Sequence, residues 1–128
     1  MSEKKILVVD DEKQNLMLFR DLFSNGGYTV WSAESGEEAI EILKKENIQV
    51  MFLDLNLPGM SGAELCRQIR QDNPIACIHA VTGYASDYEL VNCRRAGFDD
   101  YFIKPVGLKL LLNAARDSFE KLERWKSN

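Results

Sequence analysis

The feature that most constrains the fold of this chain is a fivefold alternation of short apolar runs with longer amphipathic segments. The apolar runs have the length of strands and cover Ile6–Val9, Thr29–Trp31, Val50–Leu53, Ile75–Val81 and Tyr101–Ile103. The first and third runs are apolar at every position, which is typical of strands covered on both faces in a parallel sheet. Strands that alternate with amphipathic segments of helical length favour a fold built from β-α units.

Three of the amphipathic segments begin with a serine that is followed by a glutamate three positions later. The pairs are Ser35 with Glu38, Ser61 with Glu64, and Ser86 with Glu89. In such a capping box, the two side chains satisfy backbone amides that the first helical turn leaves free. Asp11 with Gln14 is a weaker example of the same pattern. We therefore predict that helices begin directly after these four capping positions.

Glycines and apolar spacing define the helices further. Gly26-Gly27 predicts the end of the first helix and Gly97 the end of the fourth. The apolar residues expected to face the core from the first helix are Leu18, Phe19, Leu22 and Phe23. The last helix carries one apolar stripe at helical spacing, formed by Leu108, Leu111, Leu112, Ala115, Phe119 and Leu122. We expect this helix to end near Trp125.

Five β-α units joined by right-handed crossovers predict a doubly wound α/β fold. The expected sheet has five parallel strands in the order 2-1-3-4-5, the (βα)5 or flavodoxin-like arrangement. We expect residues 1–128 to form a single domain, with a core from about residue 4 to residue 125 and no effector domain. Ligands of such sheets bind beyond the carboxyl ends of the strands, where the winding reverses between the first and third strands.

Composition narrows the function classes. The chain has 16 Lys and Arg against 20 Asp and Glu, a net charge of −4, which provides no basic surface for direct binding of nucleic acid. Its apolar runs are too short for a membrane span or a signal peptide, so we expect a cytoplasmic protein without membrane contact. The chain has one histidine, so Cys66, Cys77 and Cys93 do not form a zinc set; we expect reduced, buried thiols.

Polar residues follow the predicted strands at one edge of the sheet. Asp10 and Asp11 follow the first strand, Asp54 the third, Thr82 ends the fourth, and Lys104 follows the fifth. Carboxylates held close together repel one another unless a cation lies between them. Mg²⁺ prefers carboxylates, water and phosphate oxygens, so we predict a Mg²⁺ site. Asp11 alone could equally serve as a helix N-cap.

The same residues contain the components of phosphoryl transfer. Asp54 is the candidate nucleophile, because it directly follows a fully apolar strand that fixes its position, and a carboxylate can form an acyl phosphate. Lys104 would supply positive charge to phosphate oxygens, and the Thr82 hydroxyl would supply a hydrogen-bond donor.

Along its whole length the sequence resembles the receiver domain of bacterial two-component response regulators. The motifs that carry the resemblance are Ile6-Leu7-Val8-Val9-Asp10-Asp11-Glu12, Leu53-Asp54-Leu55-Asn56-Leu57-Pro58-Gly59-Met60-Ser61-Gly62, Val81-Thr82-Gly83 and Tyr101-Phe102-Ile103-Lys104-Pro105. The resemblance implies that Asp54 is the phosphoacceptor. It also implies that Asp10 and Asp11 hold Mg²⁺ together with Asp54, and that the backbone carbonyl of Asn56 completes the protein ligands.

The resemblance assigns roles to the later motifs as well. Lys104 would contact the phosphoryl group, Thr82 would bond to it after phosphorylation, and Tyr101 matches the aromatic residue of the family's switch. The peptide bond between Lys104 and Pro105 would be cis. Asn56 and Tyr84 occupy positions that tune dephosphorylation; Tyr84 would either shield the attacking water or lie exposed on a loop.

The function implied by the resemblance is that of a signalling switch. A histidine kinase or a histidine phosphotransfer protein would phosphorylate Asp54 in a Mg²⁺-dependent reaction. Phosphorylation would alter the surface formed by the fourth helix, fifth strand and fifth helix for contact with a downstream protein target or for onward phosphotransfer. The chain would be a monomer or a weak phosphorylation-dependent dimer. It would assist only its own phosphorylation and dephosphorylation, and so would not be an enzyme.

Two alternatives remain from the sequence. A Mg²⁺-dependent aspartyl-phosphate phosphatase or phosphotransferase of the haloacid-dehalogenase type needs a second aspartate two positions after the nucleophile, and Asn56 cannot act as that proton donor. A pseudo-receiver would bind partners without being phosphorylated, but it need not keep the whole set of site residues. Of the remaining residues, His79 is expected to be structural and Trp31 to lie in the core. Trp125 could anchor a partner or fold back.

Overall fold

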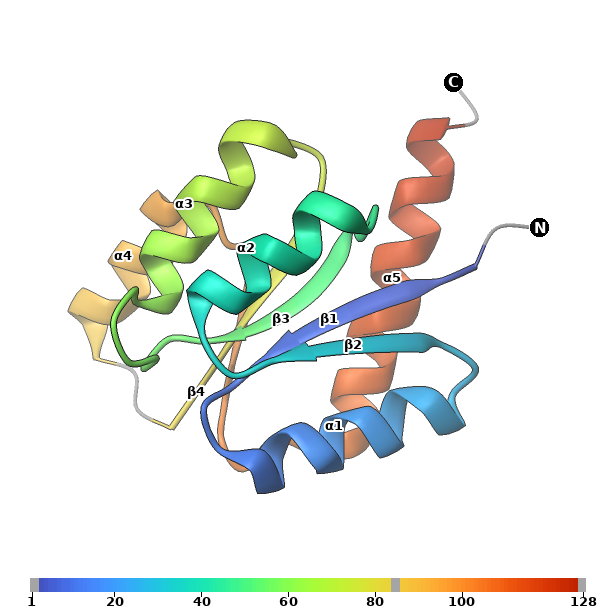
Figure 1. Cartoon of the computed structure of the whole chain (residues 1–128), viewed down its shortest axis with the longest axis horizontal. Coiled ribbons are helices and arrows are strands. Elements are labelled where there is room, and N and C mark those ends of the chain that lie inside the picture. Colours follow the sequence, from blue (N-terminus) through green and yellow to red (C-terminus); the bar gives the residue numbers. More distant parts are fainter. Residues whose placement is uncertain (1–2, 84–85, 127–128) are drawn as a thin grey trace.

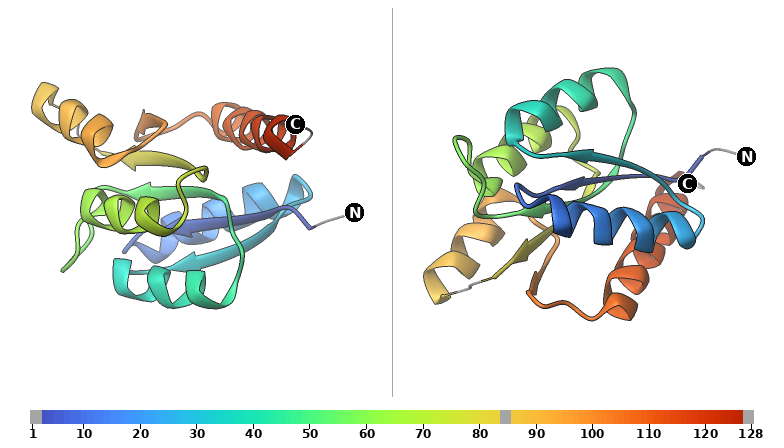
Figure 2. Two further views of the ribbon diagram at one scale, coloured as in Figure 1. Left: turned by 90° about the horizontal axis from the view of Figure 1, so that it is seen from above. Right: turned by 60° about the horizontal axis from the view of Figure 1, so that its bottom comes forward.

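A central parallel sheet with helices on both faces forms the molecule (Figures 1 and 2). The structure, a computed structural model, describes residues 3–83 and 86–126. In chain order the elements are β1 (Lys5–Val9), α1 (Lys13–Asn25), β2 (Thr29–Ala33), α2 (Gly36–Lys45), β3 (Val50–Asp54), α3 (Gly62–Asp72), β4 (Cys77–Thr82), α4 (Asp87–Ala96), β5 (Asp100–Ile103) and α5 (Leu108–Lys126). The strands lie parallel in the order β2-β1-β3-β4-β5, which confirms the predicted fold class.

Two clusters of buried side chains fill the space on either side of the sheet. One cluster joins the sheet to α2, α3 and α4, and the other joins it to α1 and α5 (Figure 1). Residues of β1 alternate between them: Leu7 and Val9 contact the first cluster, whereas Ile6 and Val8 contact the second. This two-sided burial is the physical reason for the uninterrupted apolar run in the sequence.

The serine caps begin three helices as predicted. The hydroxyls of Ser35, Ser61 and Ser86 accept hydrogen bonds from the backbone amides of Glu38, Glu64 and Glu89 at 3.1, 3.2 and 3.2 Å, respectively. Gly97 ends α4 with a φ of 106°, a left-handed conformation that glycine adopts without steric cost. Gly26 follows the last residue of α1.

The start of α1 differs from the prediction. Its N-cap is Glu12, which makes no capping bond with its own side chain, and Asp11 is exposed. The side chain of Asp10 takes the capping role instead, because its Oδ1 accepts the backbone amide of Glu12 at 2.9 Å. The proposed capping pair of Asp11 and Gln14 was therefore wrong.

Two core assignments and one strand start also need correction. β4 begins at Cys77, and Ile75 is 54% exposed in a turn whose Ala76 amide bonds to the carbonyl of Asn73. Leu18 is exposed, because it lies on the opposite side of α1 from the buried Leu16. The exposed Leu108 is the first residue of α5, one turn before the helix makes its first buried contact at Leu111.

The cysteines and tryptophans have contrasting surroundings. Cys66, Cys77 and Cys93 are buried and free, as predicted, and burial raises the pKa of the Cys66 thiol to about 12. Trp31 is only partly buried against the core, and Trp125 is 66% exposed near the end of α5. Within residues 3–83 and 86–126, no helix combines the length and apolar character that a membrane crossing requires.

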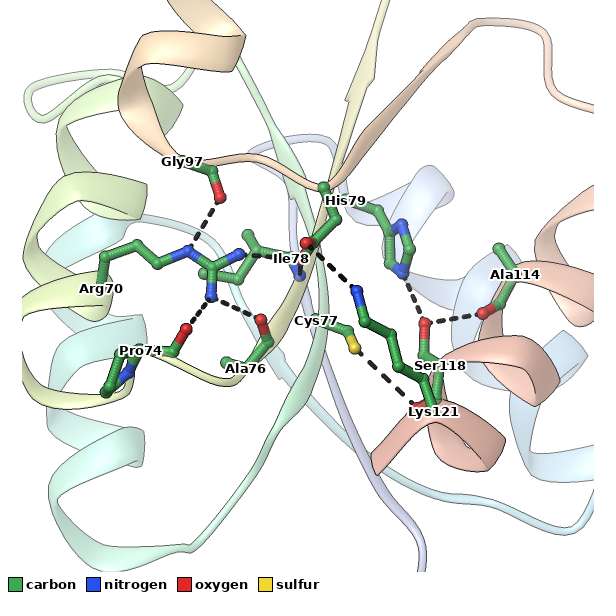
Figure 3. Close-up of polar contacts among 11 residues, drawn as sticks. Arg70, Pro74, Ala76, Cys77, Ile78, His79, Gly97, Ala114, Ser118 and Lys121 are labelled. Carbon is green, nitrogen blue, oxygen red and sulfur yellow. Dashed lines mark hydrogen bonds and ion pairs between the residues drawn. The ribbon is translucent and has the colours of Figure 1, made fainter. Parts of the chain in front are cut away.

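His79 is a buried link between β4 and α5. Its ring stacks on Phe52 with 4.7 Å between centroids. Its Nε2 lies 2.8 Å from the Oγ of Ser118 (Figure 3). The Ser118 hydroxyl donates to the carbonyl of Ala114 at 2.8 Å, so His79 Nε2 carries the hydrogen that joins the two side chains. Its buried Nδ1 has no hydrogen-bond partner among residues 3–83 and 86–126, and a charged ring would bury a second N–H there without an acceptor, which favours the neutral ring. Burial lowers the pKa of His79 from its ordinary value.

This lowered pKa predicts that acid destabilises the fold. Below the ordinary histidine pKa of 6.5, the unfolded chain binds a proton at His79 that the folded chain resists, so the free energy of unfolding falls as the pH falls. Urea unfolding from pH 7.5 to pH 5 is expected to show a steeper pH dependence for the wild type than for His79→Phe, by up to about 1.4 kcal/mol per pH unit. Equal slopes would contradict the prediction.

Candidate functional site

The three predicted carboxylates converge at the carboxyl edge of the sheet. β1 and β3 are paired in parallel with Val9 opposite Leu53, so Asp10 and Asp54 leave adjacent strands at the same level. One oxygen from each of Asp10, Asp11 and Asp54 lies within 4.8 Å of the others. Asp10 and Asp54 are 1% and 5% exposed, whereas Asp11 is exposed, so the site opens to solvent on the side of Asp11.

Lys104 links the two buried carboxylates. Its Nζ lies 2.9 Å from Oδ2 of Asp10 and 3.4 Å from Oδ2 of Asp54. The backbone amide of Asn56 donates to Oδ1 of Asp54 at 3.1 Å, which fixes the orientation of that carboxylate. Lys104 follows β5, so the chain brings its ammonium group to the edge where β1 and β3 end.

Burial, hydrogen bonds and neighbouring charges together shift the pKa values of Asp54 and Lys104. Burial raises the pKa of Asp54, the Asn56 amide lowers it, and the nearby charge of Asp10 raises it again; the net change is upward. For Lys104, burial lowers the pKa, but the hydrogen bond to Asp10 and the charge of Asp54 outweigh burial and raise it. Keeping Asp54 ionised therefore costs stability in the folded chain, whereas Lys104 stays positively charged.

The two residues predicted to form the switch lie on the next two strands. Thr82 is buried at the end of β4, one residue beyond Val81, the register partner of Asp54. The Thr82 carbonyl accepts the backbone amide of Lys104 at 2.7 Å, which places the lysine beside it. Tyr101 lies in β5 and is 40% exposed. The peptide bond before Pro105 is cis, as the resemblance implied.

Two residues at this edge were not assigned a role in the site from the sequence. Asn15, in the first turn of α1, donates from Nδ2 to Oδ2 of Asp10 at 3.2 Å. Gly62 begins α3 so close to the acceptor strand that a Cβ there would collide with the backbone of Asp54. The position of Asn15, one helical turn after the strand-end carboxylates, could have indicated its contact. Nothing in the local sequence indicates the close approach at Gly62.

The remaining site predictions have different outcomes. Asn56 lies beside Asp54, although the observed contact comes from its backbone amide. Tyr84 lies outside the described residues. The donor set of three carboxylates fits a hard divalent cation such as Mg²⁺, which binds oxygen ligands and retains several waters.

Residues 6–116 match the family model of the response regulator receiver domain, and the chain belongs to that family. It is a receiver domain of two-component signalling, a class of protein that phosphorylation activates. A CheY-like receiver domain from Methanospirillum hungatei has a TM-score of 0.92 at 32% identity, covering 96% of this chain and 98% of that one. A BeF3-activated DrrB receiver domain has a TM-score of 0.86 at 30% identity, with 93% and 99% covered.

Curated relatives that match the chain are longer proteins. The virulence sensor protein BvgS of Bordetella pertussis is 40% identical over 114 residues, and the match covers 84% of this chain and 9% of that protein. A probable transcriptional regulator of Porphyridium aerugineum is 32% identical over 128 residues, covering 100% of this chain and 53% of that protein. The chain therefore spans only part of the length of each of these relatives.

Proposed function

We propose that this chain is a phosphorylation-dependent signalling switch in which Asp54 accepts a phosphoryl group from a phosphohistidine. The donor would be a histidine kinase or a histidine phosphotransfer protein. The observation that carries the proposal is the position of Asp54: a buried strand-end carboxylate, fixed by the Asn56 amide and adjacent to both Asp10 and Lys104. An oxygen of Asp54 would form the new bond to phosphorus while the bond from phosphorus to the imidazole nitrogen breaks.

Asp10, Asp11 and Asp54 would hold Mg²⁺ through their carboxylates, together with the backbone carbonyl of Asn56. When bound, the cation supplies positive charge that balances the phosphoryl oxygens. Lys104 is already within reach of Asp54 and would add a second positive charge to those oxygens. Placement and charge neutralisation would supply most of the catalysis, and the chain would assist only its own phosphorylation and dephosphorylation.

The output would arise at the surface of α4, β5 and α5. The Thr82 hydroxyl would bond to the phosphoryl group, and Tyr101 would turn inward from its present exposed position. Large apolar side chains are already exposed on this surface: Tyr88, Val91, Ile103, Leu108 and Leu110. Such side chains favour a protein partner, so the output would be contact with a downstream target, weak dimerisation or onward phosphotransfer. Tyr84 would slow loss of the phosphoryl group.

Intact mass spectrometry tests the proposal and its metal requirement. Incubated with Mg²⁺ and a small acyl phosphate, the wild-type chain is expected to gain one phosphoryl group, which peptide mapping would locate at Asp54. The same incubation with EDTA in place of Mg²⁺ is expected to leave the mass unchanged. A chain that gains no phosphoryl group would contradict the proposed function, and equal gain with EDTA would contradict the metal requirement.

A further inference from the structure

The carboxylate of Asp10 is held by three donors of different kinds. Its Oδ1 accepts the backbone amide of Glu12 at 2.9 Å. Its Oδ2 accepts both the Lys104 ammonium at 2.9 Å and the side-chain amide of Asn15 at 3.2 Å. Asp10 is 1% exposed, so protein donors largely replace the water that would otherwise stabilise the charge.

Two of these donors also fix Asp10 relative to α1. Glu12 is the N-cap of α1, and Asn15 lies in its first turn. Because they bond to different oxygens of one carboxylate, they define the plane of the carboxyl group as well as its position. Removal of the Asn15 donor would leave Lys104 as the donor on Oδ2, beside the Glu12 amide on Oδ1, to oppose rotation of the group about its last side-chain bond.

The third donor has a second role in the proposed function. Lys104 bridges Asp10 and Asp54, but the phosphoryl group would attract it away from Asp10. Asn15 carries no charge, so the phosphoryl group would not attract its side chain in the same way. A neutral amide on Oδ2 keeps that oxygen hydrogen-bonded without repelling a cation, whereas a lysine or arginine in its place would repel one.

We propose that Asn15 is a positioning residue for the cation site: its side-chain amide holds the Asp10 carboxylate in its binding orientation and retains it when Lys104 leaves. This proposal rests on the proposed function, since it assumes that a divalent cation binds at Asp10. Asn15 acts through Asp10 and is not itself a ligand. Partners of metal-binding carboxylates commonly have this orienting role.

Calorimetric titration with Mg²⁺ alone tests the proposal, because it requires no phosphoryl donor. Asn15→Leu keeps a side chain of similar size but removes the donor, and we expect its Mg²⁺ dissociation constant to rise by about tenfold. Asn15→Gln, which retains the amide, is expected to recover part of the affinity. Gln14→Leu changes an exposed neighbour on the same helix and is the matched control, with affinity within about twofold of the wild type.

A second readout separates positioning from general damage to the fold. Phosphorylation by a small acyl phosphate is expected to require a higher Mg²⁺ concentration for half-maximal rate in Asn15→Leu, with the rate at saturating Mg²⁺ changed less. Asn15→Ala serves if the leucine variant does not fold. Wild-type affinity in a folded Asn15→Leu or Asn15→Ala variant would overturn the role of Asn15 alone. A wild-type chain that binds no Mg²⁺ would overturn the proposed metal site and this inference with it.

Discussion

Replacement of Asp54 by asparagine is expected to abolish phosphoryl uptake by this chain. The amide has nearly the shape of the carboxylate but is not a nucleophile at neutral pH, so no acyl phosphate can form. The variant should also fold at least as stably as the wild type. Burial and the proximity of Asp10 raise the pKa of Asp54, which means that the ionised side chain costs stability in the folded chain. Intact mass and thermal unfolding measure the two effects separately.

The matched control is Asp21→Asn, which removes an exposed carboxylate from the second half of α1, whereas the site contacts of α1 lie at the start of that helix. This variant is expected to gain one phosphoryl group at the wild-type rate. If Asp54→Asn still gained a phosphoryl group while folded, another residue would be the acceptor. The carboxylate at the end of β3 would then have to be reassigned to cation binding alone.

Replacement of Arg70 by methionine is expected to lower the free energy of unfolding by about 3 kcal/mol. The guanidinium donates to the carbonyls of Gly97, Pro74 and Ala76 at 2.8, 3.0 and 2.5 Å (Figure 3). It also pairs with Asp99 at 2.8 Å. One side chain of α3 thus joins the end of α4 to the segment that leads into β4.

The cost arises from the partners that methionine would leave behind. Asp99 would keep the Ile78 amide at 2.8 Å and the distant Lys121 ammonium at 3.9 Å, but it would lose its closest cation. The carbonyls would lose donors that methionine cannot replace. Because the side chains of Arg70 and Asp99 are 20% and 31% exposed, water offsets part of the loss, and the expected effect is smaller than for a fully buried pair.

Urea unfolding measures this effect, with Arg67→Met as the matched control. Arg67 lies on the same helix and is exposed, so its replacement is expected to change the free energy of unfolding by no more than about 0.5 kcal/mol. Equal stabilities of the two variants would show that the contacts of Arg70 contribute little beyond those of a solvated surface arginine.

The strand ends explain why much of the site could be predicted. In a parallel sheet the residue after each strand has a defined position, so Asp10 and Asp54 follow from the strand assignment alone. Lys104 follows in the same way from β5. The cis bond before Pro105 came from the resemblance to a family, because strand periodicity carries no information about it.

The missed features depend on contacts between residues far apart in the chain. Arg70 reaches Asp99, 29 positions away, and its bonds to the carbonyls before β4 accompany the turn that exposes Ile75. The apolar run therefore overestimated the length of the strand. The N-cap at Glu12 was missed for a different reason: the side chain of Asp10, rather than that of Asp11, accepts a hydrogen bond from the backbone amide at the start of α1.

The link that Lys104 makes between Asp10 and Asp54 also sets the electrostatic starting point of the site. Three ionised carboxylates and one ammonium leave a formal charge of two negative units, which a single divalent cation would neutralise. A monovalent ion would leave the site negative, whereas a trivalent ion would make it positive. Because Lys104 offsets one of the three carboxylate charges, the site of the unphosphorylated chain has the formal charge that one divalent cation would balance.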